Sequence, residues 1–219
     1  MHISVKNLLN IESKVKQKIQ DKKLNIFPKI IAVSKTFKLN NIIPLIEHGH
    51  IHFGENKVQE ALEKWTDIKL KNNKIKLHLI GKLQTNKAKF AVKLFDYIHS
   101  LDNEKLAKKI SSLQQDQNRD LGLFIQVNIG NEDQKSGVNE VNLLDFYNYC
   151  LDLKLNIVGL MCIPPVNEDA NISFKKMKNL KNKLNLKELS MGMSSDYLDA
   201  LVHDASYIRV GSSIFGERS

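Results

Sequence analysis

Residues 97–128 read YIHSLDNEKLAKKISSLQQDQNRDLGLFIQVN, and they hold one full unit of the pattern that decides the fold. A short strand is expected at 97–100. The nearly unbroken apolar run that begins at Leu121 has the length of a buried strand. The segment between them, 103–117, is expected to be a helix. A strand–helix–strand unit of this kind predicts two parallel strands joined by a right-handed crossover.

The same unit repeats on both sides of this stretch. Further strands are expected at 29–34, 51–54, 76–80, 155–161, 186–191 and 206–210, of which 186–191 is the weakest. Further helices are expected at 3–22, 40–48, 56–68, 85–95, 139–152, 168–185 and 195–205. Eight strands alternating with helices fit a closed barrel or an open doubly wound sheet, and the count of eight favours the barrel. Because only a short tail follows the last strand, the first helix is expected to fill the eighth helix position.

No linker or shift in composition interrupts the 219 residues, so we expect an α/β protein with one domain over 1–219, a single (β/α)8 TIM barrel with an extra N-terminal helix. No apolar run approaches the roughly 20 residues that cross a bilayer, and charge interrupts the N-terminus before a signal-peptide core could form. The protein is therefore expected to be cytoplasmic, without membrane contact. Cys150 and Cys162 form neither a CxxC motif nor a disulfide framework, as fits a reducing compartment.

The formal net charge of +9 is a possible sign of a nucleic-acid partner. Of the 33 basic residues, however, only Arg119, Arg209 and Arg218 are arginines. There is no arginine cluster, basic tail or patch of interleaved aromatics. The lysines are better explained as solvated helix faces, and no nucleic-acid binding is expected.

In a parallel barrel the chemistry lies at the carboxyl ends of the strands, and Lys35 follows the first strand directly. Loss of water around a lysine at such a place disfavours the ammonium form. The neutral amine is the form that attacks a carbonyl to make a Schiff base. A strand-end lysine that extends into solvent is the competing interpretation.

The loops after strands seven and eight have the character of an anion site. They read Met-Gly-Met-Ser-Ser at 191–195 and Val-Gly-Ser-Ser at 210–213, both small and rich in backbone N–H and hydroxyl donors. Barrels of this type often bind phosphate there, although a serine that caps the next helix would look the same. Arg209 lies in the eighth strand, where a rare arginine suggests a task that lysine cannot perform.

The run His48-Gly-His50-Ile-His52 raises the alternative of a metal site. Alternate residues of a strand share a face, so His50 and His52 could pair on one ion. The cluster falls at a helix end and a strand start, which is the opposite end of a barrel from its chemistry, and no fourth ligand is evident nearby. No metal is expected.

Several blocks in order give the chain a resemblance to a known family. They include Ala-Val-Ser-Lys at 32–35, Phe-Gly-Glu-Asn at 53–56 with Val-Gln-Glu at 58–60, and the highly specific His-Leu-Ile-Gly-Lys-Leu-Gln-Thr-Asn-Lys at 78–87. They continue to Leu-Ser-Met-Gly-Met-Ser at 189–194 and Arg-Val-Gly-Ser at 209–212. Over nearly its whole length the sequence resembles the pyridoxal phosphate homeostasis proteins, whose barrel is that of the alanine racemase N-terminal domain.

The resemblance implies a site for pyridoxal 5′-phosphate (PLP). It implies that Lys35 holds the cofactor as an aldimine, that Ser194, Gly211 and Ser212 hold its phosphate, and that Arg209 faces the pyridine nitrogen. Asn56 and His78 would line the ring side, and Met193 would pack on the ring.

The resemblance further implies a monomeric carrier that maintains intracellular PLP and passes it to apo PLP-dependent enzymes. Arginine cannot accept a proton from the ring, which leaves a weak electron sink. The chain also ends at Ser219, before any second domain that could supply a catalytic tyrosine. No substrate turnover is therefore expected. The alternatives are an active PLP enzyme of the racemase type and a Schiff-base aldolase. Lys135, in the loop after strand five, is a candidate for handing the cofactor on by imine exchange.

Overall fold

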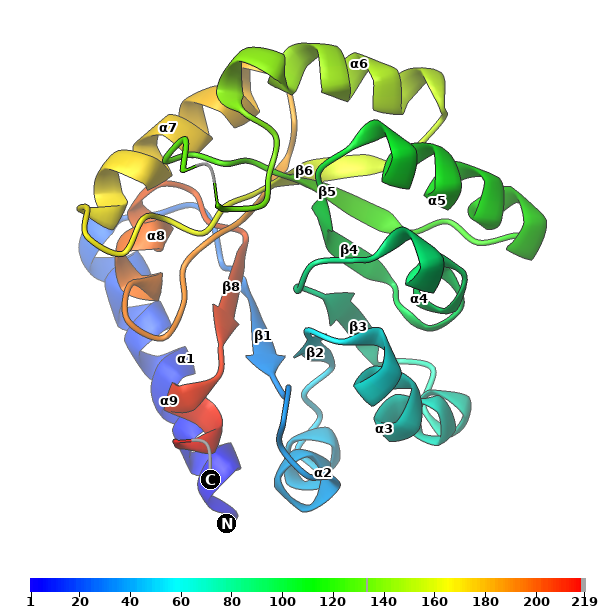
Figure 1. Ribbon diagram of the computed structural model, residues 1–219. Helices are drawn as coiled ribbons and strands as arrows, with labels where there is room; N and C mark the ends of the chain where they lie inside the picture. Colours follow the sequence, from blue (N-terminus) through cyan, green and yellow to red (C-terminus); the bar gives the residue numbers. More distant parts are fainter. Residues whose placement is uncertain (133, 218–219) are drawn as a thin grey trace.

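Eight parallel strands form a closed barrel in the computed structural model, which describes residues 1–132 and 134–217 (Figure 1). The order around the barrel follows the sequence, and the first strand pairs with the eighth. The strands are β1 Lys29–Val33, β2 His52–Glu55, β3 Lys76–Leu79, β4 Tyr97–Leu101, β5 Gly122–Gln126, β6 Ile157–Met161, β7 Glu188–Ser190 and β8 Tyr207–Val210. The predicted barrel is confirmed, and the open sheet is excluded.

Helices surround the strands (Figure 1). They are α1 Ile3–Lys22, α2 Leu39–Glu47, α3 Val58–Lys71, α4 Ala88–Leu94, α5 Glu104–Gln117, α6 Leu143–Asp152, α7 Ala170–Lys183, α8 Tyr197–Val202 and α9 Ser212–Phe215, with 3-10 turns at Thr85–Lys87 and Glu140–Asn142. As expected, α1 closes the helical layer, since it packs against α2, α8 and α9. The expected helix over 85–95 is divided into a 3-10 turn and α4, and the short α9 was not predicted.

Side chains along each strand point alternately into two buried regions, one inside the barrel and one between the strands and the helices. On β1, Ile30 and Ala32 face the helices and belong to the large core between the two layers. Ile31 and Val33 point into the barrel, where they pack with Phe124, Met161 and Tyr207. The described part of the barrel interior is therefore filled with side chains rather than hollow, which leaves the carboxyl end of the barrel as the place for a ligand of the barrel itself.

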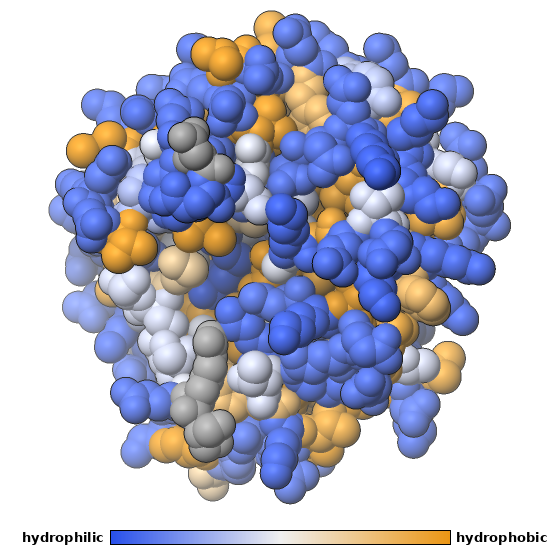
Figure 2. All heavy atoms as spheres, in the orientation of Figure 1, coloured by the Kyte–Doolittle hydropathy of each residue, from blue (hydrophilic) through white to orange (hydrophobic). Residues whose placement is uncertain are grey.

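The surface seen in Figure 2 is mainly hydrophilic, with hydrophobic residues scattered among the charged ones. Within residues 1–132 and 134–217, no helix combines the length and the apolar character needed to cross a membrane. Both cysteines are buried as free thiols, and burial raises the pKa of each to about 12.

Candidate functional site

A cavity of about 550 Å³ opens at the carboxyl end of the barrel. It is lined by Val33, Lys35, Phe37, Asn56, Ile80, Ile163, Met193, Ser194, Ser195, Arg209, Gly211, Ser212, Gly216 and Glu217. All the site residues expected from the sequence except His78 line this one cavity. Parallel strands explain the result, because their carboxyl ends all meet at one rim.

Lys35 lies two residues beyond the end of β1 and is half-buried at the cavity wall. Strand β1 ends with Val33 inside the barrel, and Ser34 is fully buried against β2. The strand thus brings the lysine from the core directly to the rim, as the sequence predicted.

Backbone donors collect at the β7–β8 side of the cavity. The N–H groups of Gly211 and Ser213 both point at the Ser194 hydroxyl oxygen, at 3.3 and 3.5 Å. These distances are long for N–H···O bonds, so the two donors are only weakly satisfied. An anionic oxygen placed there would be a better acceptor. This part of the cavity fits a phosphate group, in agreement with the anion site predicted from the loops.

The loop that supplies Ser194 has a fixed shape. Gly192 adopts φ +89°, and a Cβ on it would lie 2.7 Å from the Cβ of Ala200, so glycine is required. The N–H of Met193 then donates to Asp196 Oδ1 at 2.6 Å. Met193 and Ser194 are therefore presented to the cavity by a constrained turn.

Arg209 forms part of the cavity floor and is only 5% exposed. Its Nη1 donates to Ser190 Oγ and its Nη2 to the carbonyl oxygen of Cys162, each at 2.8 Å. Burial lowers the pKa of Arg209, although an arginine still remains charged at neutral pH. The strand-eight arginine therefore points into the barrel end and not toward the helices.

A row of three histidines continues from Arg209 through the barrel. His99 Nδ1 lies 2.8 Å from Ser190 Oγ, His99 Nε2 lies 2.9 Å from His78 Nδ1, and His78 Nε2 lies 3.0 Å from His52 Nδ1. His78 and His99 are fully buried, and burial, followed by neighbouring positive charges, lowers the pKa of both well below the usual value. The three imidazoles of this row, those of His52, His78 and His99, are therefore neutral at pH 7.

Arg209 fixes the direction of the hydrogen bonds in this histidine row. Because the guanidinium only donates, Ser190 Oγ accepts from it and directs its own hydrogen to His99 Nδ1. We therefore assign the proton of His99 to Nε2, from which it is donated to His78. By the same reasoning His78 donates from Nε2 to His52. Each hydrogen bond within the row thus has one donor and one acceptor, and the row connects the cavity floor to the amino end of the barrel.

His78 is thus not in the cavity, contrary to what the resemblance implied. It points into the barrel one layer below the cavity, where its ring stacks on that of Tyr97 with centroids 4.6 Å apart. Ile80, two residues further along the same face, lines the cavity instead. Alternation could have identified Ile80 and Val33, whereas Ile163 and Phe37 lie in segments without a regular period.

Asn56, which follows β2, is held at the rim by a contact with the segment after the adjacent strand β3. Gly81 follows β3, and a Cβ on it would collide with the backbone carbonyl oxygen of Asn56. Only glycine permits this close approach. The two blocks at 53–56 and 78–87 are therefore in contact through a glycine, which sets the position of Asn56.

Lys135 does not line the cavity. Its Nζ makes an ion pair with Glu132 Oε2 at 2.5 Å and donates to the carbonyl oxygen of Pro164 at 3.4 Å. It lies in the loop after β5, as predicted, next to residue 133, which is outside the described residues.

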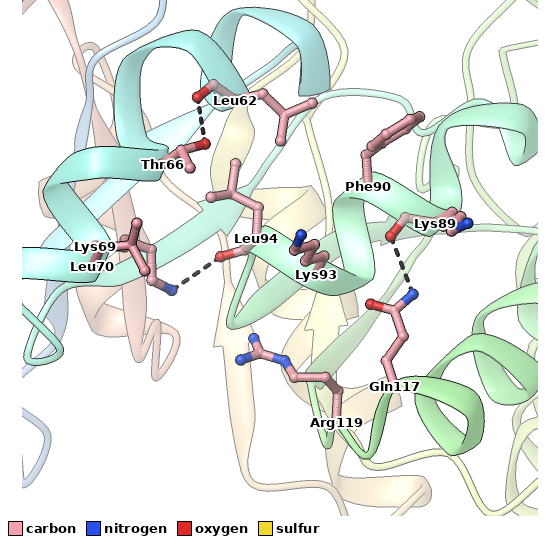
Figure 3. Close-up of a pocket in the computed structure, with 10 residues that line it drawn as sticks. All are labelled: Leu62, Thr66, Lys69, Leu70, Lys89, Phe90, Lys93, Leu94, Gln117 and Arg119. Atoms are coloured by element: carbon pink, nitrogen blue, oxygen red, sulfur yellow. Dashed lines mark hydrogen bonds between the residues drawn. The ribbon is translucent and has the colours of Figure 1, made fainter.

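A larger groove of about 800 Å³ lies on the flank between α3, α4 and the end of α5 (Figure 3). Its rim is basic, with Lys89 and Lys93 on α4, while Lys69 is bound to the carbonyl oxygen of Leu94 at 3.0 Å. The side chains drawn in Figure 3 come from α3, α4 and the end of α5, except that of Arg119, which lies in the turn after α5. None of the lining residues follows the carboxyl end of a strand, so this groove lacks the arrangement found at the cavity.

The histidines considered for a metal lie at the amino end of the barrel. His48 caps α2, His50 Nε2 lies 2.9 Å from the carbonyl oxygen of His52, and His52 belongs to the histidine row. Among the residues that the structure describes, no group of three or more His, Cys, Asp or Glu side chains is arranged to hold a metal ion.

Comparison with known proteins agrees with this geometry. The model of the family described as "Alanine racemase, N-terminal domain" matches residues 10–219. The chain belongs to this family. It is 38% identical over 200 residues to the pyridoxal phosphate homeostasis protein of Aquifex aeolicus, with 87% of each chain covered.

Solved structures within the family are also similar. PipY of Synechococcus elongatus PCC7942, in a structure without PLP, has a TM-score of 0.88 and 32% identity, covering 98% of this chain and all of that one. PipY with PLP bound has a TM-score of 0.78 at 32% identity, covering 92% of this chain and all of that one. The barrel of this family and the resemblance to its pyridoxal phosphate homeostasis proteins are thereby confirmed.

Proposed function

We propose that the chain is a single-domain PLP-binding protein that holds the cofactor through Lys35 and maintains its intracellular supply without turning over a substrate. The observation that supports this most directly is the arrangement of the cavity. Half-buried Lys35, buried Arg209 and Ser194 all line one space of about 550 Å³, and the weakly bonded N–H groups of Gly211 and Ser213 point at the Ser194 hydroxyl. The relatives named for PLP homeostasis and the PLP-bound PipY support the choice of cofactor.

The residues of the cavity fit this cofactor group by group. When bound, PLP supplies an aldehyde that a lysine amine can attack and a pyridine ring that can withdraw electrons. Ser194 and Ser212 offer hydroxyls, and the N–H groups of Gly211 and Ser213 offer backbone donors, for the phosphate. Asn56 and Met193 also line the cavity and would contact the ring.

The position of Arg209 supports binding over turnover. Both of its bound nitrogens donate to groups of the barrel, and the guanidinium has no lone pair to accept a proton from a pyridine nitrogen. It would place positive charge beside the ring of bound PLP without protonating it, and the ring would then be a weak electron sink. None of the described residues that line the cavity is a tyrosine of the kind that serves racemases as a second acid and base.

We further propose that the protein acts as a monomer in the cytoplasm and passes PLP to apo-enzymes. The two buried free thiols are consistent with a reducing compartment.

Borohydride reduction of the PLP-loaded protein, followed by peptide mapping, tests the proposal. The label is expected on Lys35. A racemase assay with several amino acids is expected to show no steady-state turnover. A label on another lysine would overturn the assignment of the site, and sustained turnover would make the protein an enzyme.

A further inference from the structure

The turn that presents Lys35 is strained. Thr36, the next residue, has φ +67°, in the left-handed region. Residues with a side chain avoid this region, and a β-branched residue is a clear outlier there. Such a conformation persists only where surrounding contacts hold it.

Helix α3 supplies those contacts on both sides of Lys35. The N–H of Thr36 donates to Glu60 Oε1 at 2.6 Å, and Lys64 Nζ donates to the carbonyl oxygen of Ser34 at 2.9 Å. Lys64 also donates to the same Glu60 oxygen, at 2.9 Å. One pair of side chains, spaced i and i+4 on a single helix, therefore binds the backbone before and after the lysine.

The clamp formed by Glu60 and Lys64 is itself anchored in the core. Lys64 donates to Glu55 Oε1 at 3.0 Å, and the same oxygen accepts from Ser34 Oγ at 2.7 Å and from Trp65 Nε1 at 2.9 Å. Glu55 is fully buried, and the Lys64 side chain is 9% exposed. A buried ion pair with so many shared partners fixes geometry more than it adds stability.

Glu60 is ionised at neutral pH. Burial acts to raise the pKa of its carboxyl, but the hydrogen bonds from Lys64 and Thr36, with the charges of Lys64 and Lys57, outweigh burial and lower it. An ionised acceptor makes the short bond to the Thr36 N–H a strong one.

We propose that Glu60 and Lys64 are positioning residues, which hold the strained turn at Thr36 so that the Lys35 amine faces the cavity. This inference rests on the proposed attachment of the cofactor to Lys35. It also gives a physical role to two of the sequence blocks, Phe-Gly-Glu-Asn at 53–56 and Val-Gln-Glu at 58–60, whose glutamates do not reach the cavity.

The test separates attachment at Lys35 from binding in the cavity. The rate of covalent attachment is followed with PLP. Affinity is followed with pyridoxine 5′-phosphate, which carries an alcohol in place of the aldehyde and cannot react with lysine. Glu60→Ala is expected to slow attachment about tenfold, because the turn relaxes from its costly conformation, and to leave affinity for the alcohol unchanged. Glu63→Gln, an exposed change on the same helix, is the matched control and should alter neither.

A second substitution tests the strain itself. Asparagine enters the left-handed region more readily than threonine, so Thr36→Asn in the Glu60→Ala protein is expected to restore most of the attachment rate. If Glu60→Ala does not fold, Glu60→Gln decides: its neutral amide oxygen is a weaker acceptor, and attachment should still be slower than in the wild type.

Three results would overturn the inference. The first is an unchanged attachment rate in every folded Glu60 variant. The second is an equal loss of affinity for pyridoxine 5′-phosphate, which would indicate general damage to the cavity. The third is a failure of Thr36→Asn to restore any attachment. A wild-type protein that attaches no PLP at Lys35 would instead contradict the proposed function, and the two failures are therefore distinguishable.

Discussion

The two sides of the cavity hold their charged groups in different ways. Arg209 is fixed by Ser190 and the histidine row, all sealed inside the barrel. Lys35 is fixed by the clamp of Glu60 and Lys64, on a helix of the outer layer, acting through the backbone of a strained turn. Arg209 is thus held by side chains inside the barrel, whereas Lys35 is held through its backbone by side chains of the surrounding helical layer.

Changes on the Lys35 side should therefore affect attachment with little effect on folding, and Lys35→Ala should show this most strongly. We expect complete loss of the visible absorption band of the attached cofactor and of the borohydride label, with an unchanged melting temperature, since Lys35 is only half-buried. Lys82→Ala, an exposed lysine in the loop after β3, is the control. An equal yield of label in Lys35→Ala would remove the distinction between the two sides.

Low pH should destabilise the folded protein through the buried histidines at the amino end of the barrel. Mainly because of burial, the pKa of both His50 and His52 is lowered from 6.5 to about 4. Between these values the unfolded chain binds more protons, so stability is complete above about pH 6.5 and is lost as the pH falls toward about 4. A shift of this size corresponds to at most about 3 kcal/mol for each histidine.

Urea unfolding across this pH range measures the effect. The double variant His50→Asn/His52→Asn is expected to lose stability less steeply than the wild type. The same steepness in both proteins would mean that other groups cause the acid sensitivity.

Removing His99 from the histidine row should lower folding stability without changing a residue that lines the cavity. His99→Leu leaves the hydrogen of the Ser190 hydroxyl without an acceptor and His78 Nδ1 without a donor, both in a buried site, although Ser190 Oγ still accepts from Arg209. Two unsatisfied buried groups predict a loss of about 2–4 kcal/mol in the free energy of unfolding. His48→Leu, at an exposed histidine, serves as the control and should change little. A neutral result for His99→Leu would mean that the row does not stabilise the barrel.

The smallest effect is expected for Lys135, which belongs neither to the Arg209 side nor to the Lys35 side of the cavity. Lys135 is ion-paired with Glu132 and is not among the residues that line the cavity. If it receives the aldehyde from Lys35 during release, Lys135→Ala should slow reactivation of an apo-enzyme at equal initial loading, with unchanged loading at equilibrium. Equal transfer rates would show that Lys135 has no part in delivery.

Much of the site was predictable because strand periodicity is a local property. The sequence alone located the eight strands, and parallel strands bring their carboxyl ends together whatever the details of packing. Lys35, Ser194, Arg209 and Gly211 were therefore correctly expected at one rim. The family resemblance alone suggested His78, which points into the barrel and contacts His99.

The tertiary structure decided how deep each residue lies in the barrel and which distant residues contact one another. Periodicity shows which face of a strand a residue occupies, but not its height along the barrel axis. That height depends on how the strands are staggered around the barrel. His78 therefore lies one layer of side chains below the cavity. The clamp joins residues 24 to 30 positions apart, and the row joins residues up to 91 apart. No local pattern records such contacts, since they arise only when the closed barrel brings β1, β7 and α3 to fixed positions.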